Sequence, residues 1–250
     1  MSAHFASVDH RPWPLPEGEW TSRQTWHDLL FAHWPVPAAV LRPFVPAALE
    51  IQEFNGTSWV GFVPFRMTGV TLRGWPSIPG LSAFPEMNLR LYVEHQGRAG
   101  VWFISLDACK RPAVWAARRL YNLPYFFARI SARHKGNRVL YDAARALSSA
   151  PVEFRGDYGP TGPVYQARRG SIDHFLTERY CLYAQDRRGR ITTIEIHHDA
   201  WPLQAANWTV DRFTVATAQG IAIQGEPVLH FAKRLDVVFW PMKEAQGPRP

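Results

Sequence analysis

The sequence predicts one mainly β domain with a few short helices, and three observations support this fold class. Trp and Pro are abundant, with 11 and 21 copies in 250 residues, which favours aromatic-lined β structure with irregular connections over a helix bundle. The segment 86–95 alternates between polar and apolar residues, as a strand does. Asn55-Gly56 separates the segments 49–54 and 58–65, which predicts a hairpin. No repeat or linker divides residues 1–250, so we expect one domain.

The remaining elements are predicted from periodicity and from the residues that end them. Helices are expected at 21–34, where Trp26, Leu29, Leu30 and His33 have helical spacing before Pro35, from Pro112 to Leu123-Pro124, and at 171–179 with Ser171 as N-cap. Further strands are expected at 100–107, 125–134, 138–141, 181–185, 190–197, 228–231 and 235–240, with a weak one in 152–164. Pro64 indicates an edge or a bulge, and 201–218 is ambiguous. Residues 1–20 are expected to form an arm, 71–84 a functional loop and 241–250 a loose tail.

Charge and cysteine usage restrict the class of protein. The net charge of +7 comes from scattered basic residues without a run or a nucleic-acid motif, which indicates a solvated surface and no nucleic-acid partner. Cys109 and Cys181 lack CxxC spacing, the N-terminus lacks the apolar segment of a signal peptide, and no apolar run is long enough for a bilayer. We therefore expect a cytoplasmic protein without a membrane partner. The sequence leaves homo-oligomerisation open.

The segment 103–129 combines polar groups with apolar surroundings, and we interpret it as the floor of an interior pocket. Phe103, Ser105 and Asp107 are expected on one face of its strand. Arg118 and Tyr121 are three residues apart on the following helix and are expected to share a face. Arg118 either holds a ligand carboxylate or forms a structural ion pair with Asp107. Both alternatives stay open at this stage.

Polar residues on the strand 86–95 form a second candidate set. Glu86, Asn88 and Arg90 share one face, which points either into a pocket or into solvent. Burial and the neighbouring Arg90 would tune the charge of Glu86. A metal site is not expected, since His197 and His198 are adjacent on a strand and point to opposite faces. The familiar catalytic signatures, GxGxxG, the Walker loop, HExxH and GxSxG, are absent.

Several segments in matching order resemble a known family. They are QTWHDLLFAHWPV (24–36), SWVGFVPFRM (58–67), FPEMNLRLYV (84–93), GVWFISLDA (100–108), AARRLYNLPY (116–125), FLTERYCLY (175–183) and IHHDAW (196–201). They are similar to the bacterial YqjF-like family of unknown function, placed in the acetoacetate decarboxylase-like superfamily. One departure is Asp199-Ala200-Trp201, where proline is expected before the tryptophan. The resemblance implies a mixed β-barrel that encloses a pocket, with helices outside.

The resemblance also bears on the chemistry. Glu86 matches a glutamate of the decarboxylase relatives, and Arg118 matches the arginine of an Arg-Glu pair in which Arg119 here replaces the glutamate. Tyr125-Phe126 stands where those relatives carry two lysines. A Schiff-base mechanism needs an amine, which tyrosine cannot supply, and Lys110 is the one remaining candidate. Decarboxylation of the acetoacetate type is therefore not expected.

The expected function is the binding of a small organic acid or carbonyl compound in the pocket. Glu86 is the candidate acid or base and Tyr125 a phenol donor, while Arg118 is the candidate carboxylate anchor. Further candidate ligand contacts are Asn88, Arg90, Tyr121 and Asp107. An enzyme of this kind would be lyase- or hydrolase-like without a cofactor. The alternative is a non-catalytic small-molecule sensor or carrier with the same pocket.

Overall fold

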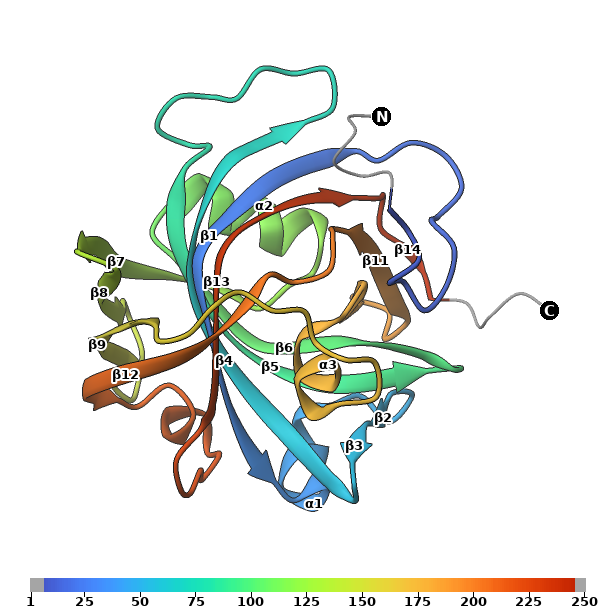
Figure 1. Cartoon of the computed structure of the whole chain (residues 1–250). Helices are drawn as coiled ribbons and strands as arrows, with labels where there is room; N and C mark the ends of the chain where they lie inside the picture. The colour runs from blue at the N-terminus through green and yellow to red at the C-terminus, as the bar shows by residue number, and fades with distance from the viewer. Residues whose placement is uncertain (1–6, 246–250) are drawn as a thin grey trace.

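The computed structural model describes residues 7–245 and shows a mainly β protein built on one large, strongly curved sheet (Figure 1). Its strands are β1 (Ser22–Val36), β2 (Glu50–Ile51), β3 (Glu53–Phe54), β4 (Thr57–Leu72), β5 (Phe84–His95), β6 (Arg98–Ala108), β7 (Tyr125–Lys135), β8 (Arg138–Arg145), β9 (Glu153–Pro160), β10 (Cys181–Gln185), β11 (Ile191–His197), β12 (Leu203–Phe213), β13 (Val228–Phe239) and β14 (Lys243–Glu244). The helices are short: α1 (Ala38–Leu41), α2 (Arg111–Leu120), α3 (Ile172–Thr177) and the 3-10 turns η2 (Arg42–Phe44) and η3 (Thr217–Gln219). The predicted fold class of a mainly β protein with few helices is confirmed.

The strand pairings form a circuit within the sheet. β11 pairs with β10, β10 with β6, β6 with β5, β5 with β4, β4 with β1, β1 with β13, and β13 with β11 again. β7, β8, β9 and β12 extend the sheet between β6 and β13. The pairs of β6 with β7 and with β10 are parallel, and the others are antiparallel.

The helix predicted at 21–34 is wrong, because this segment is strand β1. It pairs with β13 on one side and with β4 on the other. Every side chain from Leu29 to Trp34 is buried, so both faces of the strand are covered and the alternation that marks a half-buried strand is missing. Polar His27 and Asp28 separate Trp26 from Leu29 and so produce the apparent helical spacing.

A bulge in β1 explains Pro64, which was expected at an edge or a bulge. The register of β1 with β4 shifts between His27 and Ala32, and Asp28 within this gap has φ +52°. Pro64 lies opposite the gap and pairs in register with Met87 of β5 on its other side. Proline has no N–H to donate, and it fits here because the hydrogen-bond ladder between β1 and β4 is already interrupted at the bulge.

Most other predicted elements are confirmed. The hairpin turn between β3 and β4 has Asn55 at φ +51° and Gly56 at φ +75°. α3 begins after Ser171, whose hydroxyl accepts a hydrogen bond from the backbone of His174. The ambiguous segment 201–218 contains β12 and η3, and the two closing strands are one continuous strand, β13.

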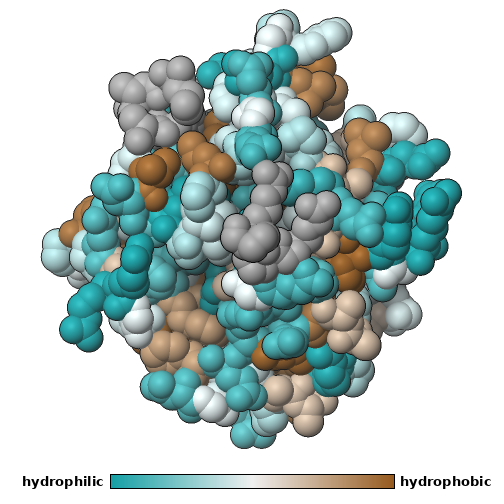
Figure 2. All heavy atoms as spheres, turned by 90° about the vertical axis from the view of Figure 1, so that its right-hand side faces the viewer, coloured by the Kyte–Doolittle hydropathy of each residue, from teal (hydrophilic) through white to brown (hydrophobic). Residues whose placement is uncertain are grey.

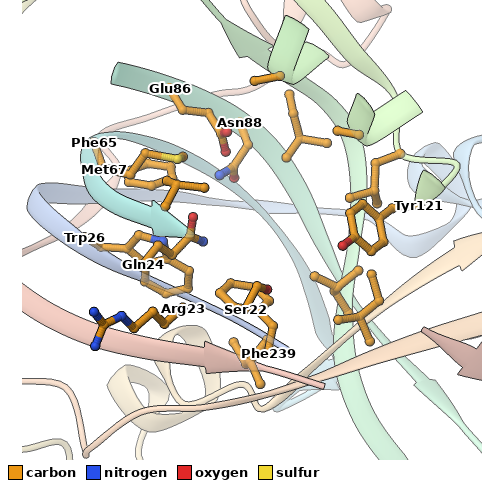
Figure 3. Close-up of a pocket in the computed structure, with 18 of the residues that line it drawn as sticks. Ser22, Arg23, Gln24, Trp26, Phe65, Met67, Glu86, Asn88, Tyr121 and Phe239 are labelled. Carbon is orange, nitrogen blue, oxygen red and sulfur yellow. The ribbon is translucent and has the colours of Figure 1, made fainter. Parts of the chain in front are cut away.

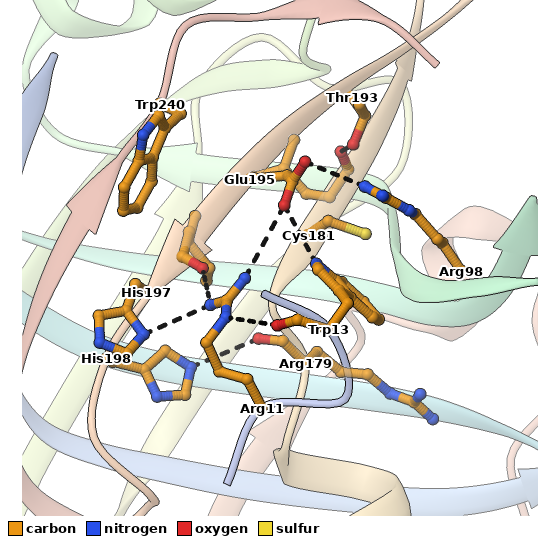
Figure 4. Close-up of polar contacts among 12 residues, drawn as sticks. Arg11, Trp13, Arg98, Arg179, Cys181, Thr193, Glu195, His197, His198 and Trp240 are labelled. Atoms are coloured by element: carbon orange, nitrogen blue, oxygen red, sulfur yellow. Dashed lines mark hydrogen bonds and ion pairs between the residues drawn. The ribbon is translucent and has the colours of Figure 1, made fainter. Parts of the chain in front are cut away.

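The two ends of the described chain are attached to the sheet near β11. Arg11 is buried and donates to the Ile196 carbonyl at 2.7 Å, while the Trp13 indole donates to Glu195 at 3.1 Å (Figure 4). The expected N-terminal arm is therefore held against β11 through Arg11 and Trp13. Its first six residues lie outside the described part of the chain. β14 pairs with β11, so the segment expected as a loose tail begins with a short strand, and 246–250 also lie outside the described residues.

The surface is largely polar where Figure 2 views it. Apolar residues are scattered there in small separate groups among hydrophilic ones, which is ordinary for a protein surface. Within the described residues, no helix combines the length and the apolar character needed to cross a membrane. The same part of the chain contains no cluster of three or more His, Cys, Asp or Glu side chains that could hold a metal ion.

Candidate functional site

A cavity of about 550 Å³ is lined by residues from most strands of this circuit. This volume is in the range of small-molecule sites. The lining is mostly apolar and comes from β1, β4, β5, β6, β10, β11, β13, α2 and the loop that joins β4 to β5; examples are Trp26, Val63, Phe65, Met67, Phe84, Val101, Phe103, Leu106, Ala113, Ala117, Leu182, Ile194 and Phe239 (Figure 3). Trp75, Ile78 and Leu81 of the loop expected to be functional also contribute to the lining.

The polar face of β5 points into this cavity. Glu86, Asn88 and Arg90 line it, while Met87 and Leu89 between them are buried on the other face. Figure 3 shows Glu86 and Asn88 next to each other, across the cavity from Tyr121. The alternation had left an interior face and a solvent face equally open. The structure places this set in the lining of the cavity.

Glu86 and Tyr125 are hydrogen-bonded in the cavity. The Tyr125 hydroxyl donates to Glu86 Oε2 at 2.8 Å, and the parallel pairing of β6 with β7 brings Tyr125 to this place. Burial raises the pKa of Glu86 to about 8, although the hydrogen bond from Tyr125 lowers it, and the charge of Asp107 raises it further. Burial and the neighbouring Glu86 also hold the pKa of Tyr125 well above its usual range. At neutral pH the pair therefore consists mainly of a carboxylic acid and a phenol.

A bulge in β6 changes which of its residues face the cavity. Leu89 pairs with Ser105 and Arg90 with Phe103, so Ile104 is the extra residue. The predicted shared face of Phe103, Ser105 and Asp107 is therefore wrong. Phe103 and Leu106 line the cavity, and the bulge turns Asp107 to the other face.

Asp107 has an arginine partner other than the expected one. Arg145 Nε and Nη2 donate to its two carboxylate oxygens at 2.7 and 2.8 Å. Both side chains are buried, and Asp107 is not among the residues that line the cavity. The structure thus shows a structural ion pair at this position, made with Arg145 of β8 instead of Arg118.

Arg118 lies outside the cavity. α2 lines the cavity with Ala113 and Ala117, and Tyr121 directly after it lines the cavity too, whereas Arg118 is exposed. Tyr121 follows the last helical residue and has φ −116°, so the three-residue spacing does not place it on the face of Arg118. Of the expected ligand contacts, the structure brings Glu86, Asn88, Arg90, Tyr121 and Tyr125 together; Arg118 and Asp107 lie elsewhere.

No lysine lines the cavity. Lys110 precedes the first residue of α2, and Lys135 ends β7. Lys233 pairs with Asp28 at 2.7 Å and Lys243 with Glu195 at 2.9 Å. All four lie in the described part of the chain, and none is among the residues that line the cavity.

Three cavity residues were not predicted. Arg179, His198 and Trp201 line the cavity. Burial lowers the pKa of His198 to about 4, and its Nδ1 lies 2.7 Å from the Asp199 carbonyl, which is typical of a neutral structural histidine. No local sequence signal marks Arg179, which directly follows the acidic Glu178 in the segment Phe175 to Cys181.

Comparison with known proteins identifies the family. Residues 23–236 match the DUF2071 family, described as an uncharacterized conserved protein. The chain belongs to this family. It is also 42% identical over 231 residues to the uncharacterized protein YqjF of Bacillus subtilis, covering 92% of this chain and 95% of that protein.

Solved structures share the fold at low sequence identity. The enduracididine biosynthesis enzyme MppR, solved in complex with pyruvate, has a TM-score of 0.62 and 13% identity over 91% of both chains. An acetoacetate decarboxylase-like enzyme from Sphingomonas wittichii has a TM-score of 0.62 and 12% identity, over 92% of this chain and 94% of the enzyme. Acetoacetate decarboxylase of Legionella pneumophila has a TM-score of 0.59 and 15% identity, over 95% and 94%. The DUF2071 member described here thus has an acetoacetate decarboxylase-like fold, as the resemblance implied.

Proposed function

We propose that this protein binds a small organic acid or carbonyl compound inside a β-barrel, and that Glu86 and Tyr125 act on it without a lysine Schiff base. The circuit of strand pairs supports the barrel. The observation that carries the proposal is the Glu86–Tyr125 pair, an un-ionised carboxyl beside a phenol in a largely apolar cavity. Perturbed acids in clefts are frequent at functional sites.

The pair can polarise a carbonyl group. A protonated Glu86 still has one O–H to donate while its Oε2 accepts from Tyr125. A ligand carbonyl that accepts this hydrogen bond gains electrophilic character, and its α-protons become more acidic. Asn88 lies beside Glu86 with its Oδ1 buried and without a hydrogen-bond partner, so it is available to accept from a ligand. A lyase- or hydrolase-like reaction is the chemistry that this arrangement supports best.

The comparisons and the cysteines support the proposal indirectly. Fold neighbours include acetoacetate decarboxylase and an enzyme solved with pyruvate. Acetoacetate and pyruvate, the compounds in these names, are both small oxo acids. Cys109 and Cys181 are free thiols, in keeping with a reducing compartment such as the cytoplasm.

The test compares ligand binding with proton exchange. Isothermal titration with 2-octanone should give saturable binding to the wild type. NMR in D2O should then show protein-dependent exchange of its α-protons, lost in Glu86→Gln and reduced in Tyr125→Phe. Binding without exchange would favour the non-catalytic sensor or carrier. If neither 2-octanone nor any carboxylate of similar size binds, the proposed function is wrong.

A further inference from the structure

Two arginines meet at the end of the cavity that is remote from Glu86. The Arg179 guanidinium carbon lies 5.1 Å from the centre of the Tyr92 ring and 4.6 Å from that of Phe175. The Arg90 guanidinium carbon lies 5.6 Å from the same Tyr92 ring and 5.1 Å from that of Phe31. Aromatic rings thus hold both cations in place, and both residues line the cavity.

Neither arginine forms a salt bridge among the described residues, although the charge of Glu94 acts on Arg179. Arg179 Nε and Nη2 are buried without any hydrogen bond, and so is Arg90 Nε. Arg90 Nη2 donates at 3.3 Å to the Tyr92 hydroxyl and at 3.2 Å to the Leu176 carbonyl, which directs its guanidinium toward Tyr92. Burial lowers the pKa of Arg179 to about 10, so its guanidinium is still charged at neutral pH.

Other buried arginines of this chain show what is missing. Arg145 has both oxygens of Asp107, and Arg11 lies 3.8 Å from Glu195. In Figure 4 the side chain of Arg179 extends away from the Glu195 cluster and makes no contact there. Buried N–H groups of a cation without a hydrogen-bond acceptor are costly, and a site that keeps them beside a cavity is suited to an anion from outside.

The two unpaired atoms of Arg179 identify the kind of anion. Nε–H and one N–H of Nη2 lie on the same edge of the guanidinium plane, and their spacing matches the two oxygens of a carboxylate. The rest of the cavity is mainly apolar, which suits a hydrocarbon body better than a second charged group. The ligand that fits is an acid with one carboxylate and an apolar chain.

We propose that Arg179, assisted by Arg90, binds the carboxylate of an elongated monocarboxylic acid whose apolar body extends through the cavity toward Glu86. This inference rests on the proposed function and adds the ligand class. Arg179 takes the anchoring role that the sequence had suggested for Arg118.

The geometry of β5 sets the length of the ligand. Glu86 and Arg90 are four residues apart on the same face, so their Cα atoms are roughly 13 Å apart at the usual rise of a strand. An acid of two to four carbons cannot contact both ends. A chain of about eight carbons comes close to this span, and each buried methylene should improve the dissociation constant by about fourfold.

The test compares an acid with an alcohol of the same length. Isothermal titration with butyrate, hexanoate and octanoate should give affinities that increase along the series, and octanoate should bind the wild type more tightly than 1-octanol. In Arg179→Met the octanoate affinity should fall by about 10- to 100-fold, with 1-octanol unaffected. Arg179→Lys keeps the charge but loses the paired donors and should give an intermediate value. Arg119→Met, on the exposed side of α2, is the matched control and should bind as the wild type does.

The outcomes separate this inference from the proposed function. If 1-octanol or 2-octanone binds the wild type but octanoate binds no better, the anion site is wrong while the cavity still binds ligands. A preference for octanoate that persists in folded Arg179→Met overturns it too. Should Arg179→Met not fold, Arg179→Lys and the wild-type comparison decide. If none of these compounds binds, the proposed function fails and the inference fails with it.

Discussion

The Tyr125 hydroxyl donates a hydrogen bond of 2.8 Å to Glu86 Oε2, although the two residues are 39 positions apart in the chain. The contact forms because β6 pairs with β5 on one side and with β7 on the other. It offsets part of the desolvation that raises the pKa of Glu86. The pKa of Glu86 therefore depends both on its burial and on its hydrogen bond with Tyr125.

The first prediction concerns the pH dependence of stability. The pKa of Glu86 is about 8 in the folded protein, against 4.5 as its ordinary value. Between these values the unfolded chain loses the proton and the folded one keeps it, so the free energy of unfolding falls as pH rises from about 4.5 to about 8. Glu86→Gln has no carboxyl to ionise, so its free energy of unfolding should not show this fall. Measured by urea unfolding, the stability of the variant relative to the wild type should therefore increase by about 3–5 kcal/mol from pH 4.5 to pH 8. The exposed Glu226→Gln should instead follow the wild-type profile; a parallel profile for Glu86→Gln would contradict the raised pKa.

The second prediction concerns Tyr125→Phe. Removal of the hydroxyl takes away a hydrogen bond that lowers the pKa of Glu86, so this pKa should rise further and the fall in stability should extend to higher pH. The variant should lose about 1–2 kcal/mol at pH 5, measured by urea unfolding. Tyr165→Phe is the control, because its hydroxyl donates to Asp173 at the surface and its removal should cost less. An unchanged or lower pKa of Glu86 in Tyr125→Phe would be inconsistent with this geometry.

The sequence predicted β5 from its polar face and failed at β1, where both faces are buried. The alternation from Glu86 to His95 led to β5 and to three cavity residues, because a cavity face differs in polarity from a core face. β1 has no such contrast, since Leu29 to Trp34 are all buried, and a continuous apolar segment has no period of its own.

Bulges and distant partners limited the prediction of the site. The extra residue Ile104 in β6 reverses the faces that simple alternation gives to Asp107, and nothing in the local sequence marks it. The contacts of Arg145 and Arg179 depend on strand order, which brings β8 to Asp107 and places Arg179, two residues before β10, at Tyr92. Their roles follow from tertiary contacts and could not be derived from spacing.

The third prediction concerns close packing between β9 and β12. A Cβ on Gly156 would lie 2.3 Å from the Thr209 carbonyl oxygen, so the two strands would have to separate. Gly156→Ala should therefore lower the free energy of unfolding by about 1–3 kcal/mol. The control is Gly162→Ala, where the nearest atom would be the Ala205 Cβ at 3.6 Å, and it should change stability by less than about 1 kcal/mol. Equal effects of the two substitutions in chemical denaturation would show that the strands are not in close contact at Gly156.

The fourth prediction compares two Arg–Asp pairs that differ in burial. Arg145 and Asp107 are almost fully buried, at 5% and 0% side-chain exposure, whereas Arg155 and Asp142 are 64% and 52% exposed. Arg145→Met leaves the Asp107 carboxylate buried and unpaired, which should destabilise the protein by about 3–5 kcal/mol at pH 7. Arg155→Met should cost less than about 1 kcal/mol.

A pH series distinguishes the lost ion pair from lost packing. Arg145 lowers the pKa of Asp107 against the effect of burial, so without it this pKa rises and Asp107 takes up a proton on acidification. A neutral Asp107 needs no cation, and the deficit of Arg145→Met relative to the wild type should therefore shrink as pH falls from 7 toward 4. A deficit that is constant over this range would mean that the arginine stabilises the fold through packing alone.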